Sequence, residues 1–248
     1  MSGYVYVMSD IHGNSRRFDS VMKKINLLPD DTLYILGDVI DRYPDGIKIL
    51  RKIMKMPNVK MLFGNHEHMM LCALDTEYYK KIYGLKRPMY IHDDYLWYRN
   101  GGYVTHRYLK HIRLDMRKEV FDYLRNLPLN YDICVNGQKF KLIHGGLTDR
   151  FEKYKHSYSN LTEYAVWHRI DDVSDFDYED YILVFGHTPT ENYSEKNPLC
   201  IYESNNVIGI DCGSGFPESD SSQSSQGRLA CLRLNDLKEF YSDENIDS

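Results

Sequence analysis

The 248-residue sequence predicts a layered α/β fold. Short apolar runs of strand type alternate along the chain with segments in which apolar residues recur at three- and four-residue intervals, as in helices. The early strand-type runs are almost continuously apolar, which indicates strands that are covered on both faces. Sheets enclosed by helices satisfy both observations.

Eight apolar runs are expected to form strands, at residues 4–8, 32–36, 59–63, 131–135, 140–144, 181–185, 206–210 and 229–234. Helices are expected at about 15–26, 45–55, 66–73 and 116–126. Residues 78–110 are polar, aromatic and weakly periodic, so we expect an inserted cap or a set of long loops there. Residues 218–227 are of low complexity and too polar to pack, which predicts a mobile loop. Without an internal repeat or a linker, residues 1–248 are expected to form one domain.

Composition narrows the classes of partner. The formal net charge is -5 and no block is dense in lysine and arginine, so we expect neither nucleic acid nor an anionic membrane as a partner. The N-terminus has no basic lead-in followed by a long apolar stretch, and no apolar run approaches the roughly 20 residues that span a bilayer. The five scattered cysteines fit reduced thiols. These features predict a soluble, cytoplasmic protein.

Five strand-to-loop transitions carry the same residue types. They read DIHGN at 10–14, GDVIDR at 37–42, GNHE at 64–67, HGG at 144–146 and GHT at 186–188. In open α/β sheets the carboxyl ends of the strands lie on one edge, and ligands collect in the crevice there. We therefore expect the five clusters to converge.

Convergence would create a set of oxygen and nitrogen ligands without a thiolate, a set that suits Mn, Fe or Zn. Its members are Asp10, His12, Asp38, Asn65, His144 and His187. One aspartate among them could bridge two ions. Two ions about 3.5–4 Å apart activate a bridging water and hold phosphate oxygens in phosphatases and nucleases. Any one histidine taken alone is more often a structural residue, but that alternative does not account for five such clusters in one chain.

The ordered motifs D-x-H, G-D-x-x-D-R, G-N-H-E, H-G-G and G-H-T resemble those of the calcineurin-like metallophosphoesterases. More narrowly, they resemble the phosphoprotein phosphatase branch, with its bacterial and phage serine/threonine phosphatases and the symmetrical diadenosine tetraphosphatases. Three further stretches extend the likeness: WYRNGG at 97–102, WHR at 167–169 and GIDCGSG at 209–215. The fold that the resemblance implies is a layered β-sandwich with flanking helices, in the order α-β-β-α.

The resemblance also implies a role for each ligand. Asp10 and His12 would bind the first metal and Asp38 would bridge, while the second metal would take the remaining three: Asn65, His144 and His187. The implied cofactors are two divalent metal ions, with Mn²⁺ expected first and Fe or Zn as alternatives.

Catalytic and substrate-binding roles follow from the same resemblance. His66 would be the general acid that protonates the leaving oxygen, and Asp41 would orient its ring and favour its charged form. The substrate would be bound by Arg42, Arg169 and Asn65. The two arginines would grip its phosphate, because a guanidinium can hold two phosphate oxygens at once.

Other positions receive structural roles or remain open. Glu67 is expected to be a structural hydrogen-bonding residue or a first-turn helix residue, and Asn14 a turn or helix-capping residue. Asn100 either caps a helix or touches the substrate. Tyr43 and Phe63 stand where relatives carry glycine and arginine. Tyr43 either rebuilds its loop or adds an aromatic wall to the pocket, and Phe63 removes a cation that could face the phosphate.

The leading functional hypothesis is a serine/threonine protein phosphatase that works by direct attack of metal-activated water, without a phosphoenzyme. The alternative is a bis(5'-nucleosyl)-tetraphosphatase, which would use the same metal centre on a phosphoanhydride. The expected partner is accordingly a phosphoprotein, or a phosphorylated small molecule or nucleotide. A third hypothesis, a catalytically silent metal- or phosphate-binding protein, predicts a missing ligand or a missing His66, and the sequence lacks neither.

Overall fold

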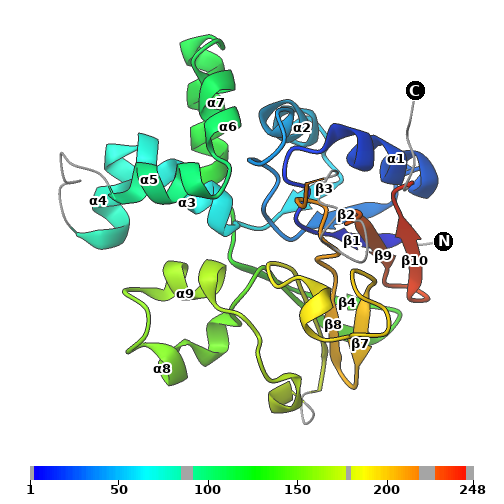
Figure 1. Ribbon diagram of the computed structural model, residues 1–248. Helices are drawn as coiled ribbons and strands as arrows, with labels where there is room; N and C mark the ends of the chain where they lie inside the picture. The colour runs from blue at the N-terminus through cyan, green and yellow to red at the C-terminus, as the bar shows by residue number, and fades with distance from the viewer. Residues whose placement is uncertain (1–2, 85–91, 177–179, 218–226, 244–248) are drawn as a thin grey trace.

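The structure is a computed structural model that describes residues 3–84, 92–176, 180–217 and 227–243 (Figure 1). Two five-stranded mixed sheets form its centre. The first sheet has the order β10 (Lys238–Tyr241), β9 (Ala230–Arg233), β1 (Val5–Met8), β2 (Thr32–Ile35) and β3 (Val59–Met61). The second has the order β4 (Asn130–Val135), β5 (Gln138–Ile143), β6 (Ile182–Phe185), β8 (Val207–Gly209) and β7 (Tyr202–Ser204).

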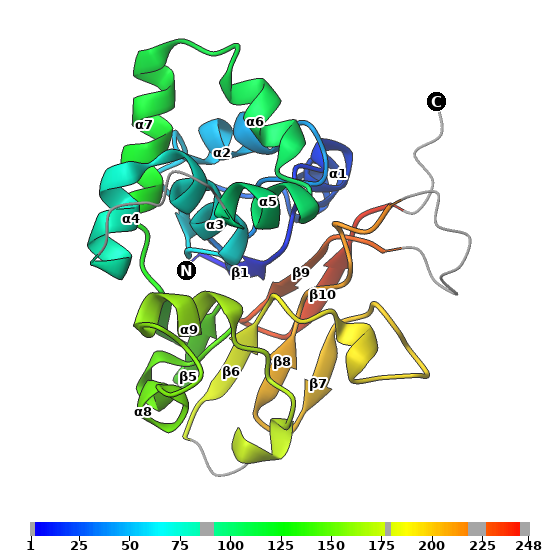
Figure 2. The same ribbon diagram turned by 60° about the vertical axis from the view of Figure 1, so that its left-hand side comes forward.

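Helices flank both sheets (Figure 2). Seven accompany the first sheet: α1 (Ser15–Ile25), α2 (Gly46–Ile53), α3 (Asn65–Leu74), α4 (Thr76–Tyr83), α5 (His92–Arg99), α6 (Tyr103–Leu109) and α7 (Leu114–Arg125). Beside the second sheet lie α8 (Phe151–Tyr154), α9 (Leu161–Trp167) and the short 3₁₀ turns Thr148–Arg150, Val173–Phe176 and Thr190–Asn192.

The layers follow from the two-residue period of the strands. In β1, Tyr6 and Met8 belong to the apolar cluster that contains the helices of the first sheet, whereas Val7 between them belongs to the cluster between the sheets. In β6, Val184 joins the cluster between the sheets and Phe185 packs on the outer face. The strands are covered on both faces, and the predicted α-β-β-α sandwich is confirmed.

All eight predicted strands and all four predicted helices are present, and no end differs from its predicted position by more than two residues. Two strands were not predicted, β7 and β10. Both read as polar and partly exposed. They lie at sheet edges, where one side of the strand needs no apolar cover.

The expectation of an inserted cap or long loops at 78–110 missed helical structure: the described part of this segment contains most of α4 together with α5 and α6. The helices form because Trp97 and Leu109 are buried in the same apolar cluster as α1, α2 and α3. Residues 85–91 of this segment lie outside the described residues, as do all positions of the predicted mobile loop except Gly227. Among the helices that the structure describes, none is both long enough and apolar enough to cross a bilayer.

Candidate active site

The site lies where strands of the two sheets end. β1, β2 and β3 are parallel neighbours in the first sheet, and β5 and β6 are parallel neighbours in the second. Each is followed by one of the five clusters. The structure buries every one of the six predicted metal ligands: Asp10, His12, Asp38, Asn65, His144 and His187.

Asp38 occupies the centre of the cluster. Its Oδ2 lies 3.9 Å from Nε2 of His12 and 3.8 Å from Nε2 of His66. Its Oδ1 lies 3.5 Å from Nε2 of His144. Two ligand-competent groups therefore share Asp38, one with His12 and His66 and the other with His144 and His187, and in each group the donor atoms lie within 4.8 Å of one another. A residue that bridges two ions must belong to the ligand groups of both, and Asp38 meets this requirement.

Backbone carbonyls orient the histidine rings of the cluster. Nδ1 of His144 lies 2.6 Å from the carbonyl oxygen of Leu36, which places the ring proton on Nδ1 and leaves Nε2 facing Asn65 Oδ1 at 2.9 Å. Nδ1 of His12 lies 3.3 Å from the carbonyl of Ile40, so its Nε2 faces the carboxylates. Metal-binding histidines are oriented in the same way, by a hydrogen bond from the other ring nitrogen.

The backbone is strained at the site. Six site residues have a positive φ, a conformation that costs a non-glycine residue about 1–3 kcal/mol. They are Asp10 (54°), His12 (51°), Asp38 (53°), Asp41 (73°), Arg42 (63°) and His187 (63°). Hydrogen bonds between neighbouring loops hold two of them in place, from His12 N to Asp38 O at 2.9 Å and from Asp10 N to Gly37 O at 3.2 Å. Strain collected where the strands of the two sheets end is typical of a functional site.

The charges of the cluster fit a pair of cations. Burial, together with the negative charge of Asp38, raises the pKa of Asp10. Burial and the positive charge of Arg42 lower the pKa of His12 well below its usual range, and burial has the same effect on the pKa of His187. Neutral imidazoles and carboxylates are the forms that bind metal. Because two buried carboxylates at close range are costly without nearby positive charge, this donor set fits two divalent cations.

Beside Asp38 lies a histidine with its own carboxylate. Nδ1 of His66 donates to Asp41 Oδ2 over 2.8 Å, and the indole N–H of Trp97 donates to the same oxygen over 2.8 Å. Burial lowers the pKa of His66, but the charges of Asp38 and Asp41 outweigh it and the net pKa is raised. The protonated form of His66, which can act as a proton donor, is thus favoured. Its Nε2 is also close enough to Asp38 and His12 to share a metal.

Sequence reasoning assigned no role to Trp97 or to Thr105, whose hydroxyl oxygen accepts the backbone N–H of Asp41 over 3.0 Å. Trp97 is fully buried at the end of α5, and Thr105 is buried in α6. The unpredicted helices therefore position the partner of His66. In the sequence, only the tryptophan of WYRNGG pointed to this segment. The resemblance of that stretch to the family motif did not reveal which residue the tryptophan contacts.

Two structural expectations are confirmed. The Glu67 carboxylate accepts the backbone N–H groups of Asp38 and Val39, each over 2.9 Å, and that of Gly64 over 3.2 Å. Burial and the charge of Asp38 raise the pKa of Glu67 to about 8. The Asn14 side chain caps α1 by accepting the N–H of Arg17 over 3.1 Å.

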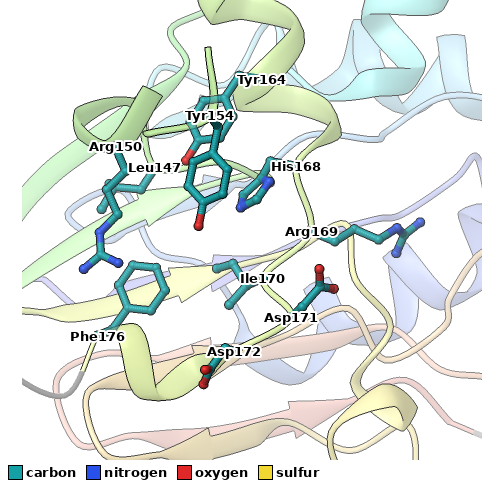
Figure 3. Close-up of a pocket in the computed structure, with 10 residues that line it drawn as sticks. All are labelled: Leu147, Arg150, Tyr154, Tyr164, His168, Arg169, Ile170, Asp171, Asp172 and Phe176. Atoms are coloured by element: carbon teal, nitrogen blue, oxygen red, sulfur yellow. The ribbon is translucent and has the colours of Figure 1, made fainter. Parts of the chain in front are cut away.

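The two predicted phosphate-gripping arginines lie next to different ligands of the cluster. The exposed Arg169 donates from Nη1 to the carbonyl oxygen of His187 over 3.2 Å. It also borders a pocket of about 90 Å³ whose rings include Tyr154, Tyr164 and His168, and in Figure 3 its side chain points away from those rings. The guanidinium of Arg42 lies close to His12, because a Cβ added at Gly215 would stand 2.6 Å from Arg42 Nη1 and 2.4 Å from His12 Cδ2. Their contact with substrate stays a prediction.

The two departures from the expected motifs have different consequences. Phe63 is buried and packs on His68 and Tyr78, with both ring centroids 6.0 Å away, so this position faces the core and the expectation of a lost phosphate-facing cation was wrong. Tyr43 lines an open groove next to Arg42, and its hydroxyl donates to the carbonyl of Phe216 over 2.7 Å. Of the two alternatives, the structure therefore has the aromatic wall.

Fold and site together define an α/β sandwich with a buried cluster of carboxylates and histidines that could hold metal ions. The pattern of the calcineurin-like phosphoesterase family matches residues 3–212, and the chain belongs to this family.

Two curated relatives and one solved structure are similar along much of the chain. A symmetrical bis(5'-nucleosyl)-tetraphosphatase of Acidovorax sp. is 28% identical over 58% of this chain and 44% of its own length. Serine/threonine-protein phosphatase 2 of Salmonella typhimurium is 25% identical over 67% of this chain and 68% of its own length. A metallophosphoesterase from Sphaerobacter thermophilus has the same fold, with a TM-score of 0.54, 15% identity and coverage of 96% and 86% of the two chains. The chain thus matches less than half the length of the tetraphosphatase.

Proposed function

We propose that this protein is a two-metal phosphoesterase that hydrolyses phosphate esters. The observation that carries the proposal is the position of Asp38 between two buried ligand groups, with the His66–Asp41 pair beside it. The first metal would be held by Asp10, His12 and Asp38, and the second by Asp38, Asn65, His144 and His187. When bound, two divalent ions, in our proposal Mn²⁺, would polarise phosphate oxygens and make water a stronger nucleophile at neutral pH.

The side chains divide the remaining work. Arg42 and Arg169 hold the phosphate from two sides. His66 gives a proton to the leaving oxygen, which would otherwise depart as a costly anion. Asp41 keeps the His66 ring oriented and charged, and Trp97 fixes Asp41 through the indole N–H. The charges of Asp38 and Asp41, which raise the pKa of His66 against the effect of burial, support this assignment because they favour the protonated ring.

Two substrate classes fit this reaction. Phosphoserine and phosphothreonine in proteins are supported by the Salmonella phosphatase, whose match extends over 68% of its length. Dinucleoside tetraphosphates are supported by the higher identity of the Acidovorax relative, 28%, and by an open groove next to Arg42.

The proposal is tested by removing metal with a chelator, restoring Mn²⁺ and following p-nitrophenyl phosphate hydrolysis. Turnover should vanish and return with the metal, and an absence of metal-dependent turnover would refute the proposal. Phosphoserine peptides and diadenosine tetraphosphate are then compared at matched concentrations. The substrate with the higher kcat/KM identifies the class.

A further inference from the structure

A groove of about 750 Å³ opens next to Arg42 and is walled by three segments of the chain. This volume lies within the range of small-molecule binding pockets, roughly 300–1,000 Å³. The lining residues are Arg42, Tyr43, Arg99, Asn100, Gly101, Gly215, Phe216 and Pro217. None of these eight described residues is acidic, and two of them are arginines.

The segment that carries Arg99 is fixed against the loop that carries Arg42. The backbone N–H of Arg42 donates to the carbonyl of Gly101 over 3.1 Å. Gly101 has a φ of 92°, and a Cβ there would stand only 2.9 Å from Arg42 N. The indole of Trp97 anchors the same segment to Asp41. Because these contacts flank position 99 on both sides, the backbone of Arg99 has a set position relative to Arg42.

The third wall connects the groove to the ligand cluster. Gly215 lies against His12 and the guanidinium of Arg42, where any larger residue would collide with both. Tyr43 holds the adjacent Phe216 through its hydroxyl. A ligand whose phosphate lies at the cluster can therefore extend along the groove without leaving the protein surface.

The residues that line the groove indicate which chemical groups the part of the ligand beyond the cluster would carry. Arg42 is next to the cluster and can neutralise the phosphate that reacts, so Arg99 offers a second guanidinium to a second anionic group. Arginine binds phosphate through paired hydrogen bonds. Tyr43 and Phe216 add aromatic rings, which provide faces for stacking of a flat ring system. A phosphate chain that carries an aromatic base combines these features in one molecule.

We propose that Arg99 binds a second phosphate of the substrate, so that the groove favours nucleoside polyphosphates over isolated phosphomonoesters. This inference rests on the proposed two-metal hydrolysis and selects between its substrate classes. The reaction adds one water across a P–O–P bond: the water oxygen bonds to the phosphorus under attack and gives up a proton to solvent, the bond to the bridging oxygen breaks, and His66 donates its proton to that oxygen and is reprotonated from solvent.

The variant Arg99→Gln tests the inference, with four substrates: diadenosine tetraphosphate, inorganic tripolyphosphate, a phosphoserine peptide with acidic neighbours and p-nitrophenyl phosphate. We expect KM for the two polyphosphates to rise about tenfold, the scale of one lost charge-assisted hydrogen bond. Both kcat and KM for p-nitrophenyl phosphate should stay unchanged, since this monoester has no second phosphate. The control is Arg107→Gln, an exposed arginine on α6 that packs over Tyr103 and does not line the groove.

Three results would overturn the inference. The first is an unchanged KM for the polyphosphates, and the second is an equal rise in KM for p-nitrophenyl phosphate. The third is a rise in KM only for phosphoserine peptides with acidic neighbours, which would make a peptide the occupant of the groove. Calorimetric titration of tripolyphosphate into the Mn²⁺-loaded wild type and variant separates this inference from the proposed function. If neither protein hydrolyses any substrate but the Kd for tripolyphosphate is about tenfold higher in the variant, the proposed hydrolysis is refuted and the phosphate subsite at Arg99 is supported.

Discussion

The ligand cluster around Asp38 and the groove next to Arg42 adjoin each other but are built in different ways. The cluster is buried, and strained backbone and short hydrogen bonds fix its side chains. The groove is open, and its two arginines are exposed. Each ligand of the cluster belongs to a short motif at a strand end, whereas the groove needs three segments that are distant in sequence. In our proposals the cluster carries out the reaction, and the groove selects the substrate.

Removal of Asp38 should have the largest effect, because both ligand groups share it. In Asp38→Asn we expect kcat to fall by at least about three orders of magnitude, on the order of 4 kcal/mol of transition-state stabilisation. Bound metal should also decrease, as measured by atomic absorption after desalting. The exposed Asp132, which pairs with Lys141 on the neighbouring strand, provides the matched control Asp132→Asn. Retention of both ions with near-normal turnover would show that the cluster is not organised around Asp38.

The His66→Asn variant distinguishes a proton donor from a ligand. We expect kcat to fall about 1,000-fold, within the range that general acid catalysis contributes, while the metal content stays the same. The loss should be smaller for a substrate with a good leaving group, such as p-nitrophenyl phosphate, than for an alkyl phosphate. A parallel loss of metal would instead assign His66 to the first ligand group, a role that its 3.8 Å distance from Asp38 allows.

The two regions also differ in how far sequence could predict them. A buried strand followed by a ligand motif is a local pattern, so the strands, the layered fold and the six buried ligand candidates could be predicted. The environment of Asp41 could not, because Trp97 and Thr105 reach it from helices whose apolar periodicity is weak. Phe63 was misjudged for a related reason: a motif gives the residue type but not which way the side chain points, and here it packs on Tyr78.

His68 belongs to neither the cluster nor the groove. It tests whether the burial of a histidine makes the stability of the protein depend on pH. It is buried in α3 between the hydroxyls of Tyr78, at 2.8 Å, and Tyr83, at 3.2 Å, and burial lowers its pKa from 6.5 to about 4. The native state therefore keeps His68 neutral, while the unfolded chain takes up a proton below about pH 6.5. Its contribution is fully present above that pH and is lost as the pH falls toward 4.

We expect the free energy of unfolding to decrease by about 3 kcal/mol between pH 7 and pH 4 because of this one group. In His68→Gln that part of the pH dependence should disappear, as measured by urea unfolding of both proteins at equal metal content. The variant of the exposed His111, His111→Gln, should keep the full dependence. Identical pH profiles for wild type and His68→Gln would mean that His68 does not remain neutral in the native state.

The smallest expected effect comes from Tyr43→Phe, which tests whether the groove can be altered without disturbing the cluster. The substitution keeps the ring and removes the hydrogen bond to the carbonyl of Phe216, worth about 1 kcal/mol. Because Phe216 belongs to the third wall of the groove, KM for diadenosine tetraphosphate should rise about fivefold. Hydrolysis of p-nitrophenyl phosphate should not change, nor should either activity in Tyr4→Phe, an exposed tyrosine that does not line the groove. An equal loss of activity on both substrates would show that the turn at Gly215 transmits the change to His12 and Arg42. The groove and the cluster would then form one rigid unit, which would set both the reaction and the choice of substrate.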